Sequence, residues 1–180
     1  MKNFKALALA AITAAATFAA PAAQARNVDQ AHINLARAIR ATGITLKINP
    51  AECNEKSAMG WYWAARQEMV VCQENRLRNF GADQEVNWTA EDLDTLRHEA
   101  QHLIQDCMDG DLQGSLGAVY QDPIALAKNT LSRRHIEGII KSYTEGGASE
   151  HIVVMELEAF SVAAMNDPAE QTSDIGKYCF

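Results

Sequence analysis

Apolar residues recur at helical spacing in several parts of the chain. In the segment 28–41, Ile33, Ala36 and Ile39 lie three residues apart, and a threonine and a glycine follow it. Apolar positions at this spacing form one face of a helix, and glycine favours its end. We therefore expect a helix over 28–41. Weaker patterns predict helices over 123–128, 132–143 and 148–165, the last of them followed by a polar tail with no further helix.

The most regular helical pattern lies in the middle of the chain. Its apolar positions follow spacings of three and four residues and are Leu93, Leu96, Ala100, Leu103 and Cys107. Thr89 can cap the first turn together with Asp92, and Asp109-Gly110 provides an exit. We expect a helix that begins after Thr89 and ends before Asp109.

Three short segments ahead of this helix favour strands. Residues 44–48 alternate between apolar and polar, and residues 60–63 and 68–72 are rich in aromatic and β-branched side chains. The last two segments are separated by a short link and predict a β-hairpin. The expected fold is therefore α+β: a mainly helical, zincin-like single domain with a small hairpin or sheet before the central helix.

The first 25 residues have the pattern of a secretory signal peptide. Lys2 and Lys5 precede an apolar run over 6–20, and Ala23-Gln24-Ala25 has the small-x-small form of a cleavage site. The run is shorter than the roughly 20 residues that span a bilayer. We expect a signal peptide over 1–25, a single domain over 26–180, and export to the periplasm or medium of a bacterium, without a membrane anchor after cleavage.

The charge of the exported part argues against two classes of partner. Removing Lys2 and Lys5 from the 16 basic residues leaves 14 against 23 acidic ones, a net charge of −9. Nucleic acids and anionic lipids attract basic surfaces, so neither is an expected partner.

Four cysteines lie in the predicted mature region. An even number of cysteines in an oxidising compartment favours two disulfides. A structural zinc site is not expected, because the sequence contains no Cys-x-x-Cys pair. Spacing does not choose among the three possible pairings. We favour Cys53 with Cys72, which closes a short loop, and Cys107 with Cys179, which ties the tail to the central helix.

The central helix carries the segment His98-Glu99-Ala100-Gln101-His102, an HExxH motif. Residues four apart lie on the same helix face, so His98 and His102 can bind one zinc ion. Glu99 lies about 100 degrees around the helix from His98, where its carboxylate can act on a water molecule instead of binding the metal.

A catalytic zinc needs a third protein ligand. The extended form HExxHxxGxxH is absent, because Gln105 and Met108 stand at its glycine and final histidine. The segment 148–165 offers Glu156 and Glu158. On a helical wheel Glu156 falls on an apolar face with two alanines, where a carboxylate needs a compensating charge, so we favour Glu156 as the ligand. Glu158 is the alternative ligand, although a solvated surface position is the stronger expectation for it.

Together these features resemble the gluzincin group of zinc metallopeptidases over residues 60–164. In that group a glutamate from a later helix joins the HExxH helix, and several families write it as Glu-x-x-Ala followed by Asp or Asn. Glu156 to Ala159 fits this pattern, but Phe160 follows. The Asp or Asn helps to hold a ligand histidine in those families, so another group must do so here.

The resemblance implies hydrolysis of a peptide or protein substrate, with zinc on His98, His102 and Glu156 and with Glu99 as general base. It further implies that residues 68–72 pair with the substrate backbone, while the acidic balance favours basic or neutral peptides. Candidates for stabilising the oxyanion are Tyr120, Tyr143, His135 and His151.

Two other functions remain open from the sequence. The motif does not distinguish proteins from other amides, so a zinc hydrolase of cell-wall peptides is one alternative. The other is an exported zinc-binding or partner-binding protein without activity. Replacing Glu99 would distinguish the second alternative from an enzyme, because only an enzyme requires this glutamate as a general base.

Overall fold

The computed structural model describes residues 28–55, 57–76, 84–108, 110, 112 and 114–180. The predicted signal peptide therefore lies outside the described residues. The structure is a mainly helical α+β domain with one small sheet, as the sequence predicted. Among the described residues, no helix combines the length and apolarity that crossing a bilayer requires. In chain order the elements are α1 (Gln30–Ala41), β1 (Thr45–Ile48), η1 (Ala51–Asn54), β2 (Gly60–Trp63), η2 (Ala64–Arg66), β3 (Glu68–Val71), α2 (Ala90–Cys107), α3 (Pro123–Thr130), α4 (Arg133–Glu145), α5 (Glu150–Met165) and α6 (Pro168–Tyr178).

The sheet has three strands in the order β1-β3-β2. Strand β2 pairs antiparallel with β3, which confirms the predicted hairpin, and β1 pairs parallel with β3 on its other side. The hairpin turn is the short helix η2 followed by Gln67 in a left-handed conformation (φ 49°). Since β3 has a partner on both sides, the prediction that residues 68–72 pair with a substrate backbone is wrong. Among the described strands, the edge strands of the sheet are therefore β1 and β2.

Helix α2 begins as the sequence predicted. The Thr89 side chain accepts a hydrogen bond from the Asp92 N–H, and the Asp92 side chain accepts one from the Thr89 N–H. Reciprocal bonds of this kind satisfy donors that a helix start leaves without partners. Beyond this cap, the apolar face of α2 packs into a core with β1, β3, α1 and α6; its fully buried members include Leu35, Ile39, Met69, Leu103, Ile104 and Ile175.

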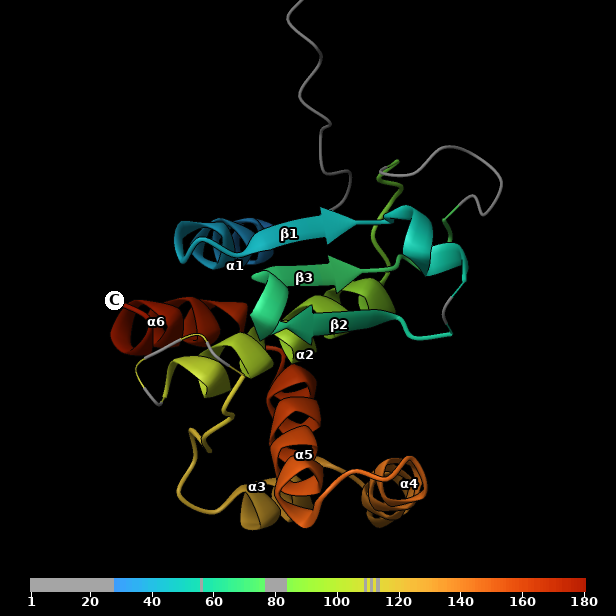
Figure 1. Ribbon diagram of the computed structural model, residues 1–180, viewed down its shortest axis with the longest axis vertical. Helices are drawn as coiled ribbons and strands as arrows, with labels where there is room; N and C mark the ends of the chain where they lie inside the picture. Colours follow the sequence, from blue (N-terminus) through green and yellow to red (C-terminus); the bar gives the residue numbers. More distant parts are fainter. Residues whose placement is uncertain (1–27, 56, 77–83, 109, 111, 113) are drawn as a thin grey trace, which may run out of the picture.

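Helix α5 joins this core to a second one. In Figure 1 it runs from α3 and α4 at one end of the domain to α2 beside the sheet. Leu157 and Val153 of α5 pack with Ala127 of α3 and Ile139 of α4. A side chain on α5 can therefore lie against α2 although more than 50 residues separate the two in sequence.

The polar tail forms a helix, so the prediction of no helix after residue 165 is wrong. Asp167 caps α6 and Pro168 occupies its first turn, where a missing N–H costs nothing. Buried Pro168, Gln171 and Ile175 recur at spacings of three and four residues. A proline that ends one helix thus also begins the next.

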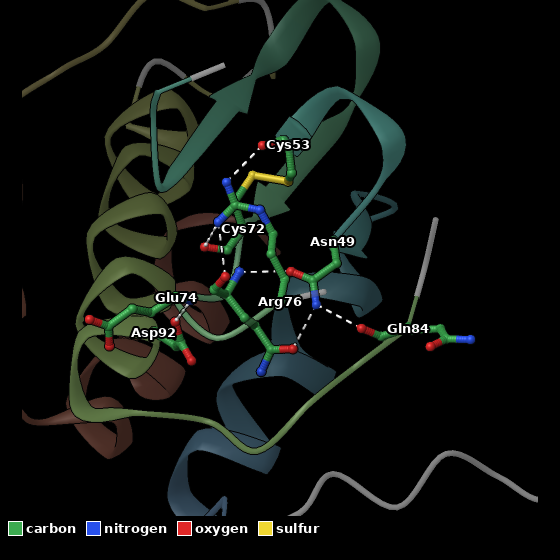
Figure 2. Close-up of a disulfide and its surroundings, with 8 residues drawn as sticks. Asn49, Cys53, Cys72, Glu74, Arg76, Gln84 and Asp92 are labelled. Carbon is green, nitrogen blue, oxygen red and sulfur yellow. Dashed lines mark hydrogen bonds between the residues drawn. A yellow bond between two sulfur atoms is a disulfide. The ribbon is translucent and has the colours of Figure 1, made fainter. Parts of the chain in front are cut away.

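Both favoured disulfides are present. Cys107 at the end of α2 is bonded to Cys179, which holds α6 against the core, and Cys53 is bonded to Cys72. Figure 2 shows Arg76 beside the second bridge, with its guanidinium donating to the carbonyl oxygen of Cys53 at 2.7 Å. In the same view Asn49 donates to the Gln84 carbonyl oxygen at 2.8 Å. These bonds hold Arg76 against η1 and Gln84 against the residue that follows β1.

Candidate metal centre

The structure brings three of the predicted site residues together. His98 and His102 lie one turn apart on α2, and Glu156 reaches them from α5. The two imidazole Nε2 atoms are 3.1 Å apart, and Glu156 Oε2 lies 3.3 Å from Nε2 of His98 and 3.4 Å from Nε2 of His102. Their side chains are only 9–12% exposed. We call these three residues the metal group.

The spacing within the metal group fits a tetrahedral ion. Bonds of about 2.0–2.2 Å at tetrahedral angles separate neighbouring ligand atoms by roughly 3.3–3.6 Å. Two of the observed separations, 3.3 and 3.4 Å, fall within that range, and the third, 3.1 Å between the two imidazole nitrogens, lies just below it. Two imidazoles and one carboxylate are also a donor set that divalent transition metals accept. The metal group can therefore bind a metal ion.

The electrostatics of the metal group also favour a cation. Burial raises the pKa of Glu156, but hydrogen bonding and the charges of His102 and His98 outweigh burial and hold that pKa well below its usual range. Burial lowers the pKa of His102, whereas Glu156 acts in the opposite direction and raises it to about 9. In the absence of a metal, the carboxylate attracts a proton to His102. A divalent cation bound there would replace that proton.

Glu99 lies beside the metal group and faces the start of β2. Burial raises the pKa of its carboxyl. This rise is counteracted by the charges of His98 and His102 and by a hydrogen bond from the Tyr62 backbone N–H. A Cβ atom on Gly60 would lie 3.0 Å from Glu99 Oε1 and 2.8 Å from the Val70 carbonyl oxygen. Only glycine lets β2 approach Glu99 so closely. Our sequence reasoning missed Gly60, although a glycine within a strand is a known sign of close approach.

A cavity of about 330 Å³ opens onto the metal group. His102 and Glu156 contribute to its wall, so both ligands are reachable from outside. Its other walls are mainly apolar and come from the end of β2, from η2 and from residues 114–116; they include Trp63, Ala64, Ala65 and Leu116. This arrangement leaves room for a ligand beside the metal.

One of the four predicted oxyanion candidates faces the metal group. Burial raises the pKa of Tyr143 well above its usual range, and the charge of Glu156, a hydrogen bond with Glu156 and the charge of Glu99 raise it further. His135 instead lies against the Phe160 ring, and His151 bonds the Leu116 carbonyl oxygen. Burial and the carboxylates of α6 and Glu158 raise the pKa of Tyr120 to about 12. Of these four candidates, Tyr143 is the one that contacts the metal group.

Glu158 is not at the surface, so the solvated position expected for it is wrong. Its side chain is fully buried and accepts hydrogen bonds from Gln101, Gln105 and the backbone N–H groups of Val119 and Tyr120. It is also not part of the metal group. A helical wheel could not reveal this, because the segment that covers Glu158 comes from elsewhere in the chain.

Phe160 occupies the position where the resembled families place Asp or Asn. Its ring lies against the ring of His98, with centroids 4.3 Å apart. His98 Nδ1 is buried and, in the described part of the chain, has no hydrogen-bond partner. His102 differs, because its Nδ1 lies 2.8 Å from Gln105 Oε1. Gln105 is therefore the group that holds a histidine of the metal group in place of the missing Asp or Asn, and the histidine it holds is His102.

Comparison with known proteins identifies one family. The model of the family described as a domain of unknown function (DUF8637) matches residues 25–180. No curated protein and no solved structure matches the chain. The matched range contains the metal group, Glu99 and the residues that line the cavity.

Proposed function

The chain belongs to the DUF8637 family, and we propose that it is an exported zinc-dependent peptidase. The observation that carries this proposal is the metal group: two imidazoles and a carboxylate at tetrahedral spacing, beside a buried glutamate and an open cavity. Zinc suits this set better than calcium or magnesium, which prefer ligand sets made of oxygen atoms. His98, His102 and Glu156 would hold the ion.

The chain's own residues then have distinct roles in peptide hydrolysis. Zinc bound there supplies a Lewis acid that activates a water molecule and polarises the peptide carbonyl. Glu99 takes the proton from the attacking water and returns it to the leaving amine. Its buried position beside β2 supports this role, because burial favours the protonated form that must exist halfway through the reaction. Tyr143 donates a hydrogen bond to the oxygen that gains charge.

The free edge of β2 is the proposed binding site for the peptide backbone. Cys72 N–H bonds the Met59 carbonyl oxygen, so in the alternating antiparallel pattern the backbone groups of Gly60 and Tyr62 point away from β3. The Tyr62 N–H bonds Glu99, which agrees with that direction. An extended peptide along this edge passes the metal group, and the apolar walls of the cavity receive one of its side chains.

Replacing Tyr143 with Phe is expected to lower kcat for a peptide about 100- to 1000-fold, as loss of a hydrogen bond to the oxyanion does elsewhere. KM should change little because the ring remains, and the assay is run at saturating zinc, because the hydroxyl contacts the ligand Glu156. Steady-state kinetics together with metal analysis check this. Tyr120→Phe is the matched control, and an equal loss of kcat in that variant would remove the role assigned to Tyr143.

Export is part of the proposal. The predicted signal peptide over 1–25 and the two disulfides support it, because disulfides form and persist in oxidising compartments. A periplasmic or extracellular bacterial location places the chain beside both proteins and cell-wall peptides. The acidic balance continues to favour basic or neutral peptides as substrates.

A substrate comparison tests the proposed function. The zinc-loaded chain from Arg26 onward is incubated with casein, with a panel of short peptides and with purified cell wall, and the products are identified by mass spectrometry. Cleavage of casein or peptides supports the peptidase. Cleavage of cell wall alone would show the amide hydrolase instead, and cleavage of none of them would leave a zinc-binding protein without activity.

A further inference from the structure

A buried polar cluster lies directly behind His102. Gln101 and Gln105 of α2 and Glu158 of α5 are at most 1% exposed, although polar side chains seldom lie so deep. Glu158 Oε1 accepts a hydrogen bond from each glutamine, at 2.9 Å from Gln101 Nε2 and at 3.0 Å from Gln105 Nε2. Of the two glutamines, Gln105 is the one that also contacts a residue of the metal group.

The hydrogen bonds of Gln105 leave one orientation for its amide. Its Nε2 lies 3.0 Å from both the Met155 carbonyl oxygen and Glu158 Oε1, which can only accept. Both N–H bonds are used in this way, so the amide oxygen must face His102 Nδ1 at 2.8 Å. His102 Nδ1 therefore carries a hydrogen, and its Nε2 is directed at His98 and Glu156, the other two members of the metal group.

Glu158 is what keeps Gln105 in that orientation. Besides the glutamines, it accepts from the backbone N–H groups of Val119 and Tyr120, each 3.1 Å from Oε2. A carboxylate accepts hydrogen bonds, so Glu158 bonds the amide nitrogen of Gln105 and leaves the amide oxygen for His102. The Gly117 N–H also donates a hydrogen bond to the backbone carbonyl oxygen of Gln105 at 2.8 Å. The cluster thus holds both the imidazole and the segment that brings Leu116 to the cavity.

We propose that Gln105 and Glu158 act as a positioning pair that fixes the His102 ring for metal binding. For this histidine, the pair replaces the Asp or Asn that the chain lacks after Ala159. The proposal rests on the metal site of the proposed function but does not require peptidase activity. Groups that hydrogen-bond a metal-binding residue in this way typically contribute about 10- to 100-fold to metal affinity.

Comparison of Gln105→Met with Gln101→Met tests the pair. Both substitutions remove a buried amide that donates to Glu158, but only the first removes the partner of His102. Zinc affinity is measured by competition with a chromophoric chelator, and thermal stability is measured on the metal-free proteins. We expect both variants to lose stability, Gln105→Met to lose about 10- to 100-fold in zinc affinity, and Gln101→Met to lose less than about threefold.

Three outcomes would overturn the pair. Equal losses of zinc affinity in the two variants would show a general effect of the cluster on folding, and unchanged affinity in Gln105→Met would show that His102 needs no partner. Wild-type protein that binds no zinc would overturn the pair together with the proposed function. If Gln105→Met does not fold, Gln105→Asn serves instead, because its shorter side chain cannot reach both His102 and Glu158. A wild-type protein that binds zinc but cleaves nothing refutes the peptidase alone.

Discussion

Replacing Glu99 with Gln is expected to lower kcat/KM for a peptide substrate by about 10²- to 10⁴-fold while zinc stays bound. The amide has nearly the shape of the carboxylate and can still accept the hydrogen bond from the Tyr62 backbone N–H. It cannot take a proton from water. Activity is measured on a fluorogenic peptide, and zinc content is measured on the same sample.

Glu91→Gln is the matched control for this experiment. Glu91 lies on the same helix, in its exposed first turn and away from the metal group. The control should keep its activity. Loss of zinc from Glu99→Gln would contradict the assignment of Glu99 as a base, because it would make Glu99 a metal ligand. Unchanged turnover would contradict it as well.

Glu156→Ala is expected to lower zinc affinity by more than the roughly 100-fold that loss of an outer partner costs, since it removes one of three direct ligands. Folding stability should fall as well, because Glu156 is mostly buried and pairs with His98, His102 and Tyr143. Zinc affinity is measured by chelator competition, and stability is measured by urea unfolding of the metal-free chain.

Glu158→Ala provides the comparison for Glu156→Ala. It leaves buried donors without a partner, which typically costs about 1–3 kcal/mol for each such group, so its stability should fall further. Its zinc affinity should fall less, because Glu158 acts through Gln105. If Glu158→Ala released the zinc and Glu156→Ala retained it, the assignment of the third ligand would be wrong.

Local pattern and simple chemistry were sufficient for several features of this protein. The capping box at Thr89 and the spacing of apolar residues predicted α2, and the wheel position of Glu156 beside two alanines predicted the third member of the metal group. These features depend on residues within a few helical turns of each other. The favoured disulfide pairing is also present, although the spacing of the cysteines did not choose among the three possible pairings.

Features that depend on distant segments could not be predicted in this way. The sequence gives no register for β1, so it could not show that β1 covers the edge of β3. Nor could it show that residues 117–120 cover Glu158, which made that acid look solvent-exposed. Helix α6 is hard to predict for another reason: the tail that forms it is polar, and its few buried positions, Pro168, Gln171 and Ile175, give only a weak apolar pattern.

The central claim is that the metal group and Glu99 together hydrolyse peptide bonds. Its most direct test is casein cleavage by the chain from Arg26 onward as zinc is titrated into the metal-free protein. We expect that activity rises up to one equivalent of zinc, disappears when a chelator removes the metal, and returns when zinc is restored. Stoichiometric zinc binding without cleavage of casein or of any peptide in the panel would contradict it.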